Sequence, residues 1–196
     1  MTTKPLSDKI AIFVAVWFFI LFTIMHLTYP DNIAPDQGMS FFGLATSPSG
    51  VSNTVTMVLF NLMLIGLGLG FLVQAVLLVK ISKLYCVIHA VMGVGFILVM
   101  FPFDRYKQIH DIGANVVYFL ALILAIRISV YGLRPDYKKW VEYSLIGFSG
   151  VLTIFLILFI GFWLAIVFIG GILQRIYLIL FFVLYAGFRL KTVSES

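Results

Sequence analysis

Long runs of apolar residues alternate with short polar hinges along the whole chain. A helix needs about 20 apolar residues to cross the hydrocarbon core of a bilayer. The runs therefore predict six membrane-spanning helices, at about 9–29, 54–79, 85–102, 109–133, 141–168 and 172–190. Backbone polar groups cannot stay unpaired in lipid, and a barrel would show short alternating segments instead. The predicted fold class is thus all-α, a polytopic transmembrane bundle of six helices that forms one domain over residues 1–196.

The composition excludes a water-soluble fold. Hydrophobic residues make up 62% of the chain and charged residues only 11%, whereas soluble domains carry about 25% charged residues. The single cysteine, Cys86, excludes an intramolecular disulfide. The first apolar run continues into Pro30 and Asp31 without a small-x-small cleavage pattern, so we interpret it as a retained span rather than a signal peptide.

The positive charges predict the orientation of the bundle. Loops rich in Lys and Arg are retained on the cytoplasmic side. With the N-terminus inside, ten of the 13 basic residues fall on the inner side, and only Arg105, Lys107 and Arg175 fall outside. Both termini are therefore expected to be cytoplasmic. The net charge of +5 is explained by this asymmetry and by contact with the bilayer and its anionic lipid head groups, so nucleic acid is not expected as a partner.

The longest connection, 30–53, contains no Lys or Arg and is predicted to be an outer loop. Its segment Met39-Ser-Phe-Phe-Gly-Leu44 is apolar enough either to lie in the membrane interface or to fold over the mouth of the bundle.

Several features of the spans predict helix packing. Gly66 and Gly70 form a GxxxG pattern, which permits close approach of two helices. Asn61 and Gln74 are interpreted as interhelical hydrogen-bond partners, and His89 as a hydrogen-bonded packing residue.

Polar residues gather at the predicted outer ends of four spans. They are His26, Asp104, Arg105, His110, Asp111, Gln174 and Arg175. His26 and His110 are expected within about 5 Å of the same boundary, given a rise of 1.5 Å per residue. Asp111, placed in the first turn of its helix, recurs with Asn115 and Tyr118 as one polar stripe that should face the bundle.

This outer cluster has two interpretations. In the functional one, His110 or His26 is a general base or a metal ligand, and the carboxylate of Asp104 or Asp111 orients its ring. The catalytic candidates are His110, Asp104 and Asp111. The predicted ligand-binding set, for an anionic head group, is His26, Arg105, Asn115, Gln174 and Arg175. In the other interpretation, the same residues cap helices and form ion pairs that fasten the spans. Two histidines at one level also fit a haem held between His26 and His110, and the sequence leaves the cofactor open.

The order of features resembles a family of small prokaryotic membrane proteins known as domain of unknown function 998. The resemblance rests on Phe101-Pro102-x-Asp104, on His110, and on Gly170-Gly-Ile-Leu-Gln-Arg175 at the start of the last span. It extends more faintly to the FRAG/DRAM/Sfk group of six-span eukaryotic proteins. It implies a six-helix bundle in a prokaryotic plasma membrane, with Pro102, Asp104 and His110 facing outward.

Three functions are compatible with the sequence. The leading hypothesis is an accessory or regulatory protein that binds a lipid or a small anion at its outer face. The second is a membrane-embedded lipid hydrolase, which leaves open whether the chain is an enzyme. The third, a small-molecule transporter, is disfavoured because no acidic residue lies near a predicted midplane. A homo-oligomer and a membrane-protein partner both stay open.

Overall fold

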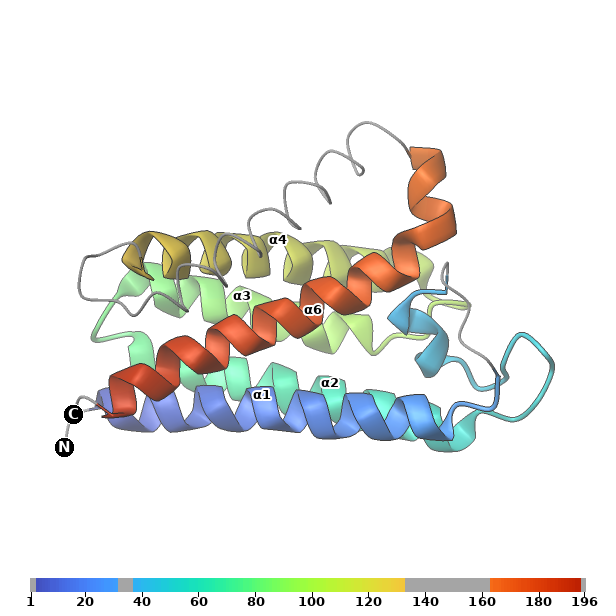
Figure 1. Ribbon diagram of the computed structural model, residues 1–196, viewed down its shortest axis with the longest axis horizontal. Coiled ribbons are helices and arrows are strands. Elements are labelled where there is room, and N and C mark those ends of the chain that lie inside the picture. The colour runs from blue at the N-terminus through green and yellow to red at the C-terminus, as the bar shows by residue number, and fades with distance from the viewer. Residues whose placement is uncertain (1–2, 32–36, 133–162, 195–196) are drawn as a thin grey trace.

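The computed structural model describes residues 3–31, 37–132 and 163–194, and these residues are almost entirely helical (Figure 1). Its elements are α1 (Thr3–Thr28), the 3-10 helix η1 (Met39–Gly43), α2 (Thr54–Leu78), α3 (Lys83–Val99), α4 (Lys107–Gly132) and α6 (Trp163–Ser194). An isolated bridge pairs Thr46 with Ser52 in the loop before α2.

The helices confirm the prediction of an all-helical membrane protein. Leu6–Thr28, Thr54–Leu78 and Lys107–Ile128 are each long and apolar enough to cross a bilayer, and Lys83–Val99 and Gln174–Gly187 are shorter apolar helices. Most of the predicted span 141–168 lies outside the described residues, so the count of six stays a prediction.

The hinge predicted between 168 and 172 lies inside a helix, because α6 begins at Trp163 and continues through Gly170 and Gly171. Intrahelical hydrogen bonds satisfy the backbone in lipid, and glycine is tolerated there. Figure 1 shows the first, orange part of α6 turned away from the rest of the helix.

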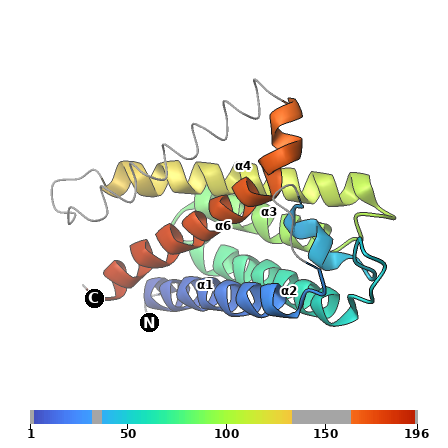
Figure 2. The ribbon, with the colours of Figure 1, turned by 45° about the vertical axis from the view of Figure 1, so that its right-hand side comes forward.

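Neighbouring helices follow one another around the bundle in the order α6, α1, α2, α3 and α4, and α4 in turn contacts α6 (Figure 2). The described ends of the chain, at the start of α1 and the end of α6, lie at the same end of the bundle, while η1 lies at the opposite end (Figure 1).

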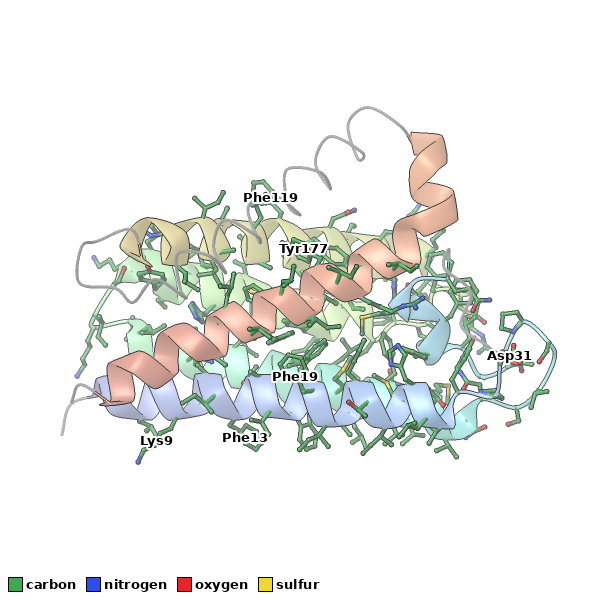
Figure 3. The ribbon with its side chains drawn as sticks, viewed as in Figure 1. Lys9, Phe13, Phe19, Asp31, Phe119 and Tyr177 are labelled. Atoms are coloured by element: carbon green, nitrogen blue, oxygen red, sulfur yellow. The ribbon has the colours of Figure 1, made fainter. Side chains whose placement is uncertain are left out.

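The interior of the bundle and its exterior are both apolar. Phe18 of α1 stacks on Phe182 of α6 in the core, with ring centroids 4.3 Å apart. Phe13 and Phe119 point outward (Figure 3), with 57% and 63% of their surface exposed. An apolar exterior around a packed interior is what a lipid environment requires, because such helices are hydrophobic all round.

Glycines allow the backbones of successive helices to approach closely. A Cβ at Gly66 would collide with the Trp17 indole, and one at Gly70 with Val14, so the GxxxG pattern fits α2 against α1 as predicted. The same arrangement joins α2 to α3, where a Cβ on Gly93 would lie 2.8 Å from the carbonyl oxygen of Gly68. It recurs between α3 and α4, where a Cβ on Gly113 would lie 2.7 Å from the carbonyl oxygen of Gly95.

A buried polar network connects α2, α3 and α6 toward the end of the bundle that the sequence predicts to be the inner one. The Tyr185 hydroxyl donates to Gln74 Oε1 at 2.5 Å, and His89 Nε2 lies 2.9 Å from the same hydroxyl oxygen. His89 Nδ1 donates to the Tyr85 carbonyl at 2.7 Å. Gln74 and His89 therefore have the interhelical packing roles that the sequence predicts.

We expect Gly93→Ala to lower the free energy of unfolding by about 1–3 kcal/mol, the usual cost of overpacking. The added methyl group would meet backbone atoms of α2, which cannot rotate away. Thermal unfolding of the purified protein in detergent measures the loss. Val94→Ala is the matched control, because Val94 is 47% exposed on the outer face of the same helix. Equal midpoints for the two variants would contradict this account of the α2–α3 contact.

Candidate functional site

The end of the bundle opposite the described chain ends, which the sequence predicts to be the outer end, is covered by η1. η1 contacts α2 and α6. Two of the η1 residues, Met39 and Phe42, are buried. The segment 39–44 therefore folds over the mouth of the bundle, which is one of the two arrangements compatible with the sequence. The Asn53 side chain holds this cap in place. Its Nδ2 donates to the carbonyl oxygens of Phe42 at 3.2 Å and Leu44 at 2.8 Å, with a longer 3.4 Å contact to that of Phe41.

His26 and Arg175 lie together beneath this cap. The His26 ring packs edge-on against Phe42, with centroids 4.9 Å apart, and its Nδ1 donates to the Phe22 carbonyl at 2.8 Å. Arg175 is within electrostatic reach of His26, and its Nη2 donates to the Gln37 carbonyl at 2.5 Å. The guanidinium group therefore serves, at least in part, to fasten the loop to α6.

His110 is positioned by the turn between α3 and α4. α3 ends at Val99, and the N–H groups of Arg105 and Tyr106 donate to the Pro102 carbonyl at 3.1 and 2.8 Å. His110 is 4% exposed, and its Nδ1 donates to the Phe101 carbonyl at 3.1 Å. A backbone carbonyl is thus the Nδ1 partner, in place of the carboxylate of Asp104 or Asp111 that the catalytic interpretation requires.

The position of Asp111 differs from the prediction. α4 starts at Lys107, so its first turn contains no acidic residue and Asp111 falls in the second turn. The predicted start was residue 109. The turn after Pro102 is short enough that the helix begins two residues earlier. The helix dipole therefore acts on Asp111 more weakly than expected.

A cavity of about 780 Å³ lies between the helices below the cap. Polar residues line it at the outer end, from His110, Asp111 and Asn115 on α4 and from Gln174 on α6. Its other described walls are mostly aromatic and aliphatic, and Phe182 lies eight residues beyond Gln174, about 12 Å deeper along α6. The cavity is therefore amphipathic along its length.

Tyr177 also lines the cavity and lies inside the bundle (Figure 3). Its hydroxyl donates to the Tyr118 carbonyl at 2.6 Å, which ties α6 to α4 beside the polar residues.

The structure divides the predicted site residues into three groups. His110, Asp111, Asn115 and Gln174 share the cavity. His26 and Arg175 lie under the cap within electrostatic range of each other. Asp104 and Arg105 are exposed on the turn and do not line the cavity. Within the described ranges, no group of three or more His, Cys, Asp or Glu side chains is arranged to hold a metal ion.

Sequence reasoning missed Asn53. Its position directly before α2 is typical of a helix N-cap, yet its side chain makes no capping hydrogen bond and binds loop carbonyls instead. The available signal was an asparagine beside a long loop whose carbonyls need donors.

The fold and the cavity are those of a helical membrane protein with an amphipathic cavity beneath η1. Comparison of the chain with family models, with curated proteins and with solved structures found no match.

We expect Asn53→Ala to release the cap, because it removes the Nδ2 donor shared by the carbonyls of Phe42 and Leu44. The loss should be about 1–3 kcal/mol, as for other buried groups left without partners. Hydrogen exchange of residues 39–44 and thermal unfolding measure it. Ser52→Ala is the control, since Ser52 is exposed and its hydroxyl contacts only that of Thr54 at 3.1 Å. Unchanged exchange in Asn53→Ala would show that another contact holds the cap.

A pH effect is expected in the outer loop, where Asp31 lies (Figure 3). The hydroxyl and backbone N–H of Ser49 donate to the Asp31 carboxylate and hold its pKa below the usual value of 3.8. A lowered carboxyl pKa means that the stabilising contribution is present above pH 3.8 and is lost as the pH falls through the lowered pKa.

The exchange rate of the Ser49 amide, corrected for intrinsic pH dependence, should therefore rise in that acidic range. Asp31→Asn should show no such step. A step of the same size in Asp31→Asn would assign it to another group.

Proposed function

We propose that this chain is a six-span membrane protein that binds a lipid in the cavity beneath η1, with the lipid head group at the polar outer end and its tail among the deeper aromatic residues. The observation that carries the proposal is the amphipathic lining of a cavity of about 780 Å³. Ligand sites typically have volumes of about 300–1,000 Å³ and a few polar groups that fix orientation.

A lipid is favoured over a small anion. The described lining of the cavity includes no Lys or Arg, although anion sites are built from such side chains. Arg105 is exposed on its turn, and Arg175 donates to a loop carbonyl. A small anion would also leave the apolar depth of the cavity unfilled.

The same proposal includes cytoplasmic termini, six spans and an accessory or regulatory role. Cytoplasmic termini are supported by the distribution of basic residues. A sixth span is supported by the apolar sequence of 141–168, and by the opposite placement of the end of α4 and the start of α6 in Figure 1. An accessory or regulatory role is favoured over a hydrolase, because His110 Nδ1 is paired with the Phe101 carbonyl and not with the carboxylate of Asp104 or Asp111.

Native mass spectrometry of protein released from vesicles of a mixed lipid extract tests this function. The wild type should carry one lipid per chain. Ala114→Phe should reduce the bound fraction at least about tenfold, which corresponds to about 1.4 kcal/mol, because Ala114 lines the cavity and a phenyl ring would occupy it.

Ile112→Phe is the matched control, since Ile112 is 58% exposed on the outer face of α4. Retention of lipid by Ala114→Phe at the level of the control would overturn binding in this cavity.

A further inference from the structure

We propose that the lipid has an uncharged, hydroxyl-bearing head group, such as a glycerol or a sugar, and that the site discriminates against phosphate. This inference rests on the proposed function and names the class of ligand for the same cavity. It comes from the balance of hydrogen-bond donors and acceptors at the outer end.

His110 presents an acceptor. Its Nδ1 donates to the Phe101 carbonyl, which can only accept, so Nδ1 carries the hydrogen. In the neutral ring, Nε2 then has the free lone pair. His110 lines the cavity, and a ligand hydroxyl is a suitable donor to Nε2.

The neighbouring groups add further acceptors. Asp111 adds carboxylate oxygens, which are acceptors. Gln174 has its Oε1 beneath the cap, close enough to Gly38 that a Cβ there would lie 2.7 Å from it. The Tyr177 hydroxyl hydrogen is already used by the Tyr118 carbonyl. The donors from the described lining include the amide groups of Asn115 and Gln174 and the hydroxyl groups of Ser40 and Tyr118, none of which is charged.

This balance disfavours a phosphate and an ammonium group for different reasons. A phosphate needs several donors and would lie beside the Asp111 carboxylate, in a lining whose described part has no cationic side chain. A trimethylammonium group carries no hydrogen-bond donor, so it would leave His110 Nε2 and Gln174 Oε1 without partners. A polyol supplies several hydroxyl donors without net charge, and each hydroxyl also accepts from an amide.

The test compares three lipids with identical dioleoyl chains in native mass spectrometry, namely a monoglucosyl diacylglycerol, phosphatidic acid and a trimethylammonium lipid. Each is present in equal amount in vesicles of otherwise constant composition. The wild type should retain the glycolipid at least about tenfold more than either charged lipid, a difference of about 1.4 kcal/mol.

Two variants identify the groups responsible. Asp111→Asn replaces an acceptor-only group with one that also donates, and should narrow the preference over phosphatidic acid several-fold. Asn115→Asp adds a carboxylate at an exposed cavity residue and should widen it. Because the two changes are expected to act in opposite directions, a general loss of stability cannot imitate both.

The outcomes separate the two proposals. If Ala114→Phe blocks binding but phosphatidic acid or the ammonium lipid binds as well as the glycolipid, the head-group inference is wrong and the cavity proposal stands. If none of the three lipids binds, or if Ala114→Phe leaves all binding unchanged, lipid binding in the cavity is wrong and the head-group inference falls with it.

Discussion

Close approach of helix backbones is the constraint on which this structure depends. Lipid tails are as apolar as leucine, so no hydrophobic effect presses membrane helices together, and van der Waals contact must do so. Gly66 and Gly70 fit α2 to α1, Gly68 meets Gly93 on α3, and α3 meets α4 at its own glycine contact. α6 is held differently, by buried aromatic side chains such as Phe182 and Tyr185. The cavity lies among all of these helices, because residues of α1, α2, α3, α4 and α6 line it.

The cap and the cavity follow from the requirement that buried polar groups find partners. The outer loop must satisfy its carbonyls where it crosses the mouth of the bundle, and Asn53 and Arg175 supply the donors. Their hydrogen bonds tie the loop to the start of α2 and to α6. The cap over the cavity is therefore anchored to both helices. The polar residues of α4 lie directly below, where a ligand head group can replace water as their partner.

The sequence predicted the helical class, the positions of most spans and the close contact at the GxxxG pattern, because these depend on local apolar content and residue size. It also predicted an interhelical hydrogen bond for Gln74 and a hydrogen-bonded packing role for His89, since a buried polar side chain has few alternatives in lipid. It did not predict the role of Asn53, whose partners are carbonyls in irregular backbone, or the early start of α6, because two glycines do not reveal whether a helix continues. It grouped Asp104 and Arg105 with the cavity residues since all follow span ends, yet the Pro102 turn leaves both exposed. The sequence shows how far a residue lies from the end of a span. It does not show which way a side chain in a turn points.

The buried Gln74–Tyr185–His89 network fixes the position of α6 along its axis, and with it the position of Gln174 at the outer end. Tyr185 lies 185 − 174 = 11 residues after Gln174, about three helical turns, so the two side chains share one face of α6. A slide of α6 by a single residue, about 1.5 Å, would separate the Tyr185 hydroxyl from its partners and displace Gln174 from Gly38 by the same step. The inner hydrogen bonds thereby set the height of a side chain at the opposite end of the molecule. A change that frees Tyr185 would alter the shape of the cavity without touching any residue at its outer end.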